Sequence, residues 1–461
     1  MSTSADKVKN LAAHTFGTWN WQKNWKAPML IEDAEGIYFY DAAGKPYIDF
    51  SSQLICSNLG HKNPALVEAI STQAGKLPYV APGFTTRIAT EAVEALLDML
   101  PESVAKFFFS TSGTEANDGA LAITRLLKSP AYKVISRYHS FHGATPAGMA
   151  FTGDPRRIPM ERVGYTVNGV LFAPDCYCYR CPFNQSYPAC DTQCARYLDY
   201  VIAEEGNVAA MIVEPVVGTN GRIVPSPEYY PIVREICDRH DVLLIADEVM
   251  SGWFRTGKVM AMEHWGVTPD IITTAKGCTS AYTPLGITAA TKPVAEHFED
   301  NLFCHGHTYA YHALCLSVIP AAMGEYKKLV ASGLLETVSA YLEKKLVALA
   351  EKHPCVGDVR GIGHFWGFEI VKDRRTKELF NTKEDKLTGA PLMTAKIAGA
   401  AMLEGLYLMP WYDTLMIAPP LIITTEQVDE ALAILDKALE IGDREAVETD
   451  VSVSTSSQYR E

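Results

Sequence analysis

The chain has 461 residues, 48% of them hydrophobic, and a formal net charge of −13 at pH 7. This length and composition allow one large and one smaller domain with sizeable cores. The acidic balance argues against nucleic acid or an anionic membrane surface as a partner, and neither a signal peptide nor an apolar run of membrane-spanning length is apparent, so we expect a cytoplasmic protein.

The first part of the chain is expected to form a meander of three short strands after an aromatic stretch. Turns that contain glycine, at residues 34–36 and 43–45, separate three runs of strand-forming residues. These runs cover residues 29–32, 37–40 and 47–50.

From residue 64 to about residue 290, helical and strand patterns alternate. Such alternation is typical of an α/β fold in which helices cover a mainly parallel sheet. Ligands of such sheets bind beyond the carboxyl ends of the strands. The expected helices cover residues 88–100, 115–127 and 228–239, and the expected strands cover residues 106–110, 133–136, 209–214, 242–246 and 271–275.

The sequence pattern of the C-terminal part of the chain predicts a separate small α+β domain. We expect the N-terminal meander to complete this domain. Its helices are expected at residues 309–329, 334–351 and 425–439. The last stretch is polar and is expected to be a disordered tail. The predicted division is residues 1–63 for the N-terminal segment of the small domain, 64–325 for the large domain, 326–442 for the C-terminal small domain and 443–461 for the tail.

Two charged residues stand at the ends of neighbouring apolar runs. Lys276 follows residues 271–275, and Asp247 follows residues 242–246. An amine and a carboxylate at adjoining strand ends are the two groups that pyridoxal phosphate (PLP) needs, one for an imine and one for the pyridine nitrogen. Taken alone, a lysine in this position is more often the solvated end of a strand.

A nucleotide-binding alternative fits the sequence less well. Residues 252–258 have the Gly and Lys spacing of a P-loop, yet Val259 stands where that loop needs Ser or Thr to hold magnesium. The match also follows Asp247 and opens no convincing helix, so we disfavour an NTPase.

The end of the strand at residues 106–110 supplies a candidate phosphate site. Ser112, Gly113 and Thr114 lie between this strand and an amphipathic helix. Backbone amides and the helix dipole favour an anion at such a helix N-terminus. A plain N-cap explains the same three residues when they are considered alone.

The next two strand ends carry an aromatic ring and a second carboxylate. Phe141, His142 and Gly143 follow one strand, and Glu214 ends the next. The Phe141 ring can lie flat on a bound heterocycle. Taken alone, each of these residues is explained as an ordinary core or strand-end residue. It is improbable that successive strand ends carry an anion site, an aromatic ring, two carboxylates and a lysine by coincidence.

Five of the 11 cysteines fall in one segment with the pattern C-x-C-x2-C-x8-C-x3-C. Four thiolates would satisfy a structural zinc site. The usual paired C-x2-C knuckles are missing, and packed thiols or a disulfide would serve equally, so these alternatives stay open. We expect no metal in the catalytic site. The five residues are Cys176, Cys178, Cys181, Cys190 and Cys194.

Taken together, the motifs resemble the class III (ω) aminotransferases of fold type I, which use PLP and have a mainly parallel seven-stranded-type sheet in a large domain. The resemblance runs from about residue 17 to residue 442. The motifs that carry it are residues 111–117, 141–143, 214–218, 246–249, 274–277, 306–309 and 418–421.

The resemblance implies a role for each matching residue. Lys276 would be the Schiff-base lysine and Asp247 the partner of the pyridine nitrogen. Val249 and Phe141 would pack on opposite faces of the ring. Thr308 would reach across from the second subunit of a homodimer, or of a dimer of dimers. The further cofactor contacts implied are Ser112, Gly113, Thr114, His142, Gly143 and Glu214.

Departures from the family pattern narrow the substrate. Met416 stands where enzymes for 4-aminobutyrate, ornithine or acetylornithine carry Arg, and Thr219 stands where the first two of these carry Glu, so both halves of the familiar Arg and Glu switch are missing. Ala144 stands where the 4-aminobutyrate enzymes carry a further Arg. A bidentate carboxylate clamp cannot be made from Met and Ala, so these substrates are disfavoured.

Residues 19–23, residues 50–54 and the insertion from Cys176 to Cys194 look most like sequences grouped with taurine:2-oxoglutarate aminotransferases. We therefore expect a small ω-amine donor, such as taurine or β-alanine, and an oxo acid acceptor, 2-oxoglutarate or pyruvate. Trp21, Leu54 and Arg156 are the expected substrate residues. Arg156 and Arg157 would supply a cation unless they form a solvated surface pair, and Arg255 looks structural.

Three other functions stay open at this point. A PLP-dependent aminomutase of the glutamate semialdehyde type differs in requiring no external oxo acid. A broad amine:pyruvate transaminase differs in its donor range. A binding or regulatory protein that retains the cofactor would show no turnover.

Overall fold

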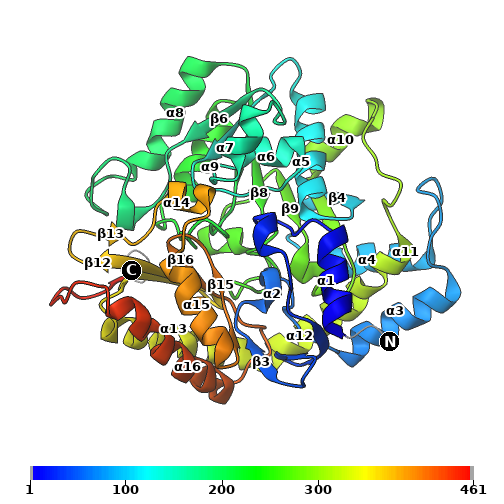
Figure 1. Cartoon of the computed structure of the whole chain (residues 1–461). Helices are drawn as coiled ribbons and strands as arrows, with labels where there is room; N and C mark the ends of the chain where they lie inside the picture. Colours follow the sequence, from blue (N-terminus) through cyan, green and yellow to red (C-terminus); the bar gives the residue numbers. More distant parts are fainter. Residues whose placement is uncertain (1–3, 457–461) are drawn as a thin grey trace.

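The computed structural model, which describes residues 4–456, is built around a seven-stranded sheet (Figure 1). The strand order is β4-β10-β9-β8-β7-β5-β6. All neighbours from β6 to β9 pair in parallel, whereas β10 is antiparallel to both β4 and β9. The prediction of a mainly parallel sheet is confirmed, although β6 and β10 had not been predicted. The strands are β4 Val104–Ser110, β5 Lys133–Arg137, β6 Val170–Ala173, β7 Val208–Val213, β8 Leu243–Asp247, β9 Ile271–Thr274 and β10 Gly286–Thr291.

Both faces of this sheet are buried under helices. In β8, Leu243 and Ile245 belong to the apolar cluster that includes α5 and α10, whereas Leu244 and Ala246 belong to the cluster that includes α8 and α9. Successive side chains of a strand point to opposite faces, so a strand covered on both sides is a continuous apolar run. The helices of this part are α3 Pro64–Lys76, α4 Arg87–Leu97, α5 Gly113–Lys128, α6 Pro146–Phe151, α7 Arg157–Arg162, α8 Gln193–Glu205, α9 Tyr229–Arg239 and α10 Lys292–Asp300.

The N-terminal meander and the C-terminal part of the chain share a second core. Strand β3 pairs in parallel with β14, and Ile48 and Phe50 pack in one cluster with apolar residues of α13, α15 and α16. The exact domain boundaries stay a prediction. The strands are β1 Ile31–Glu35, β2 Tyr38–Asp41, β3 Pro46–Asp49, β11 Val356–Ile362, β12 Phe365–Asp373, β13 Glu378–Leu379, β14 Leu406–Tyr407, β15 Met409–Pro410, β16 Thr414–Ile417 and β17 Ser454–Thr455; the helices are α1 Ser4–His14, α2 Ser52–Ile55, α12 Val318–Ala331, α13 Leu334–Lys352, α14 Lys383–Thr388, α15 Met393–Leu403 and α16 Thr425–Asp443.

Two predicted segments differ from the structure. The helix expected from residue 309 begins only at α11 (Ala313–Leu316), because Tyr311 adopts a φ of +59° that no right-handed helix allows. The expected disorder from residue 443 onward is wrong for residues 443–456, since β17 pairs with β11 and Val453 is buried. Residues 457–461 lie outside the described residues. None of the helices in the described part has the length and apolar character of a membrane span.

Candidate active site

Asp247, at the carboxyl end of β8, is buried and held by several fixed groups. Its Oδ2 accepts a hydrogen bond from Asn117 Nδ2 at 2.8 Å and lies 2.7 Å from His142 Nδ1. Its Oδ1 accepts a hydrogen bond from the backbone amide of Val249 at 3.0 Å. Asn117 is itself fixed by the Thr273 hydroxyl, which donates to Asn117 Oδ1 at 2.6 Å. These contacts orient one carboxylate at the strand ends, where it can pair with a protonated ring nitrogen.

Lys276 lies two residues after the end of β9 and is half-buried, with a backbone φ of +46°. Burial lowers the pKa of its amine, the nearby Arg156 charge lowers it further, and Cys56, Asp247 and Glu214 act in the opposite direction. A lowered pKa increases the fraction of neutral amine, which is the form that attacks a carbonyl or accepts a proton.

The N-terminus of α5 and the loop after β5 form a close-packed cradle. A Cβ on Gly113 would come within 2.8 Å of Val249 Cγ1, and one on Gly143, whose φ is +129°, within 2.0 Å of Thr114 Oγ1. Ser112 is the N-cap of α5, and Thr114 Oγ1 accepts the backbone amide of Ala144 at 3.1 Å. The first amides of a helix lack partners within the helix, so this cradle suits a phosphate.

Glu214 fixes the loop that carries Phe141. Its buried carboxylate accepts the backbone amide of Phe141 at 2.9 Å and that of Gly218 at 2.7 Å. Burial raises the pKa of Glu214, while these two amides lower it. Glu214 therefore positions an aromatic ring beside the strand ends that carry Asp247 and Lys276.

Arg156 lies among three aromatic rings next to this site. Its guanidinium carbon is 4.0 Å from the ring centre of Phe141, 4.8 Å from that of Trp411 and 5.3 Å from that of Trp19. The buried Asp154 accepts hydrogen bonds from Arg156 Nε at 3.0 and 2.9 Å and pairs with Nη2. Within residues 4–456 the hydrogen bonds of Arg156 use its backbone N, Nε and Nη2, which leaves Nη1 for a ligand.

The structure separates Arg157 and Arg255 from this position. Arg157 lies over the Phe172 ring at 4.3 Å and donates to Glu161 at 2.5 Å, so its partners differ from those of Arg156. Arg255 is fully buried and donates to Asn58 Oδ1 at 2.7 Å, among other groups of the small-domain junction. Arg255 therefore has the structural role expected from the sequence.

The remaining predicted substrate and partner residues lie farther out. Trp21 and Leu54 are each 46% exposed, and the Trp21 ring packs beside Gly389 at the end of α14. Thr308 is exposed, and its carbonyl accepts the hydroxyl of Tyr79 at 2.8 Å. The expected contact of Thr308 with a second subunit stays a prediction.

Sequence reasoning gave no role to three residues of this site: Asn117, Lys386 and Trp411. Asn117 was detectable, because it is a polar residue one turn after Gly113 on the face of the helix that packs on the sheet. Lys386 and Trp411 carry no such signal, since more than two hundred residues of chain separate them from Arg156.

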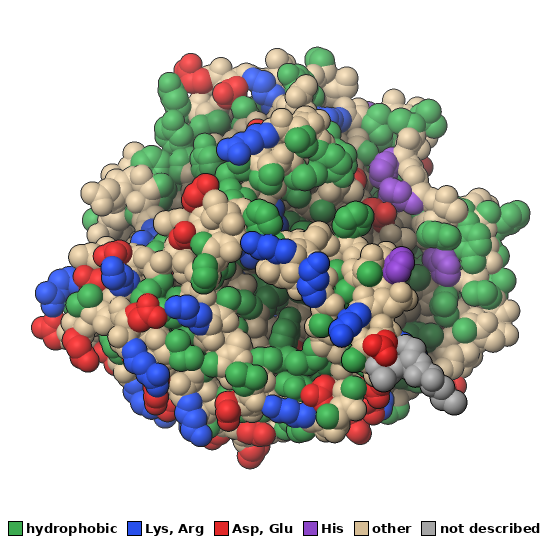
Figure 2. Space-filling model, in the orientation of Figure 1, with side chains coloured by type: hydrophobic (Ala, Val, Ile, Leu, Met, Phe, Trp, Pro, Cys, Tyr) green, Lys and Arg blue, Asp and Glu red, His purple; other side chains and the backbone are tan. Residues whose placement is uncertain are grey.

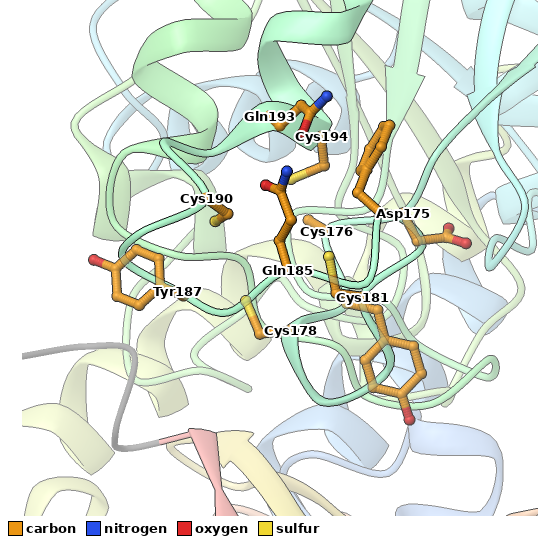
Figure 3. A pocket seen from close by; sticks show the side chains of 11 residues that line it. Asp175, Cys176, Cys178, Cys181, Gln185, Tyr187, Cys190, Gln193 and Cys194 are labelled. Carbon is orange, nitrogen blue, oxygen red and sulfur yellow. The ribbon is translucent and has the colours of Figure 1, made fainter.

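The cysteine segment lines a small cavity away from this site (Figure 3). All five residues are free thiols, and Cys176 Sγ accepts a hydrogen bond from Arg137 at 3.1 Å. Burial raises the pKa of Cys178 to about 12. In the described part of the chain, no group of three or more Cys, His, Asp or Glu has an arrangement that could hold a metal ion. The geometry thus matches packed thiols.

A buried carboxylate, an amine and an anion cradle at adjoining strand ends define a PLP-type site, and comparison with known proteins gives its family. The chain belongs to the class III aminotransferases, whose family model matches residues 21–439.

Individual relatives agree with this assignment. The chain is 34% identical over 433 residues to a putrescine–pyruvate aminotransferase of Pseudomonas aeruginosa, covering 91% of this chain and 92% of the relative. It is 33% identical to a taurine–pyruvate aminotransferase of Bilophila wadsworthia, covering 90% and 93%. The structure of a taurine:2-oxoglutarate aminotransferase from Bifidobacterium kashiwanohense, in complex with PLP and glutamate, matches with a TM-score of 0.90 and 32% identity over 97% of this chain and all of that one.

The protein is therefore a PLP-dependent aminotransferase of fold type I. The residues of the site fit the cofactor, since Gly113 leaves room beside Val249 that any side chain would fill. When bound, PLP supplies an electron sink for the bond that is broken at the donor carbon.

Proposed function

We propose that the enzyme moves the amino group of a small ω-amine that carries an acidic group, such as taurine or β-alanine, to an oxo acid, either 2-oxoglutarate or pyruvate. The observation that carries this proposal is the cation of Arg156, which lies 4.0 Å from Phe141 and has Nη1 available. The names of the taurine aminotransferases among its relatives support the same donor class.

We assign the cofactor contacts as follows. Lys276 Nζ would be the amine that holds the cofactor, and in its neutral form it could take a proton from the donor carbon as general base. The Asp247 carboxylate stabilises positive charge on the ring nitrogen. Ser112, Gly113 and Thr114 would hold the phosphate, and Phe141 and Val249 would pack against the ring. His142, Gly143 and Glu214 position these groups.

The positions of the familiar carboxylate clamp provide no cation here. Met416 is fully buried in β16, and the Thr219 hydroxyl is directed at Met250 Sδ at 3.7 Å. Ala144 is exposed and lacks a polar side chain. An acidic group on the donor must therefore be held by other residues, of which Arg156 is the best placed.

A panel of donors and acceptors tests the proposal. Taurine, β-alanine, 4-aminobutyrate, putrescine and 1-phenylethylamine are each combined with pyruvate and with 2-oxoglutarate, and the aminated product is quantified. We expect acidic donors to give the highest kcat/KM. Turnover without any added oxo acid would indicate an aminomutase, and efficient use of all amines would indicate a broad amine:pyruvate transaminase.

We further propose a homodimer, or a dimer of dimers, in which Thr308 contributes to the site of the second subunit, acting in the cytoplasm. Light scattering during size-exclusion chromatography measures the assembly, and a monomer that is fully active would contradict it.

A further inference from the structure

A second cation lies at the outer end of the site. Lys386, on the short helix α14, places its amine 5.0 Å from the ring centre of Trp411. The guanidinium of Arg156 lies 4.8 Å from the same ring centre. Although α14 belongs to the C-terminal part of the chain, this shared ring brings it next to the segment that precedes α7 (Figure 1).

The two cations differ in their distance from the cofactor end. Arg156 contacts both Phe141 and Trp411, whereas Lys386 is placed over Trp411 alone. Arg156 also acts on the pKa of Lys276. Arg156 is therefore the inner cation and Lys386 the outer one.

The charges of this region do not balance. Asp154 is the carboxylate that acts on Lys386, and it already forms a multiply hydrogen-bonded pair with Arg156. Within residues 4–456 Lys386 forms no salt bridge of its own. Burial lowers the pKa of the Lys386 amine, and repulsion from the Arg156 charge lowers it further. An anionic ligand would relieve that repulsion.

A third donor at the same place has no acceptor. Trp411 is only 7% exposed, and its indole Nε1 is buried without a hydrogen-bond partner in the described residues. An indole N–H is a donor only, and a buried donor without an acceptor is costly. The two cations over the Trp411 ring and the free N–H of the same ring are together suited to bind a carboxylate. Figure 2 shows Lys and Arg side chains around a hollow near the middle of this face.

We propose that Lys386, with Trp411 and the inner Arg156, binds the second acidic group of a dicarboxylic oxo acid, so that the enzyme prefers 2-oxoglutarate to pyruvate as acceptor. This inference rests on the proposed function. The reacting end of either acceptor lies at Lys276, and only the dicarboxylic acid has a further carboxylate to reach the outer cation.

A charge substitution on α14 tests this role. Lys386→Gln should raise the KM for 2-oxoglutarate about tenfold, because a charge-assisted hydrogen bond is lost, and should change the KM for pyruvate less than about twofold. Lys383→Gln is the matched control, since Lys383 is an exposed lysine on the same helix. Trp411→Phe keeps an aromatic ring but removes the indole N–H, and we expect the KM to rise about threefold for 2-oxoglutarate alone.

Binding gives a second readout that does not depend on turnover. Calorimetry of the holoenzyme should show glutarate binding more tightly than pentanoate, which has the same chain with one carboxylate, and Lys386→Gln should remove most of that difference. Equal losses for 2-oxoglutarate and pyruvate, or no effect of Lys386→Gln on either acceptor or on glutarate, would overturn the inference. Absence of transamination with every acceptor would overturn the proposed function instead.

Discussion

The inner and outer ends of the site are built in different ways. At the inner end, Asp247 and Lys276 come from neighbouring strands of one sheet, and Asn117 and His142 hold the carboxylate through fixed hydrogen bonds. At the outer end, Arg156 and its surrounding rings come from segments far apart in the chain, and one of these rings, Trp19, is exposed. The inner end is preorganised for one chemical reaction, whereas a few substitutions at the outer end can change the substrate specificity.

Removal of the amine at the inner end should have the largest effect. Lys276→Ala leaves no nucleophile for the cofactor and no group to move the proton at the donor carbon, so turnover should be abolished. The phosphate cradle is a separate contact, and binding of PLP should remain measurable by absorbance and by calorimetry. Lys258→Ala, which removes an exposed lysine, is the control. Near-normal turnover of Lys276→Ala would refute the assignment of Lys276 as the cofactor-binding amine.

Neutralising the inner carboxylate should have the next largest effect. Asp247→Asn keeps the shape, but its amide opposes the Asn117 amide and cannot stabilise a positive ring nitrogen. We expect kcat to fall by several orders of magnitude with the fold retained, as measured by steady-state kinetics and thermal unfolding. A loss below about tenfold, roughly 1.4 kcal/mol, would mean that Asp247 is not the nitrogen partner.

The adjacent residue provides a matched control for this change. Glu248 is also a buried carboxylate, but it accepts hydrogen bonds from Ser251 Oγ at 2.6 Å and the Met262 amide at 2.8 Å, away from Asp247 Oδ2. Burial raises the pKa of Glu248 to about 7, so near neutral pH it is already partly uncharged. Glu248→Gln should therefore leave kcat within about threefold of the native value.

The difference between the two ends also decides what the sequence could predict. Strand ends such as those before Asp247 and Lys276 are recognisable locally, because an apolar run stops at a charged residue and parallel strands bring their carboxyl ends together. The antiparallel strand β10 and the ordered residues 443–456 were missed, since pairing partners of short strands depend on tertiary contacts. Lys386 and Trp411 were missed for the same reason, because only folding brings them to Arg156.

A smaller loss than at the inner end is predicted at the outer end, where it separates Arg156 from Arg157. Arg156→Ala should raise the KM for taurine or β-alanine by a factor that corresponds to about 1 to 3 kcal/mol, the range for a lost charge-assisted hydrogen bond. A donor without an acidic group, such as 1-phenylethylamine, should be nearly unaffected. Arg157→Ala should change neither donor class, because Arg157 packs on Phe172 and pairs with Glu161.

A loss of folding stability must be kept apart from a loss of recognition, because Arg156→Ala leaves the buried Asp154 without its partner. Arg156→Lys retains the charge with fewer hydrogen bonds, so it should restore part of the selectivity between taurine and 1-phenylethylamine. The ratio of kcat/KM for these two donors is insensitive to the amount of folded enzyme. An unchanged ratio in Arg156→Ala, with both donors weakened equally, would give Arg156 a structural role, and recognition of the donor's acidic group would then fall to Lys386 and Trp411.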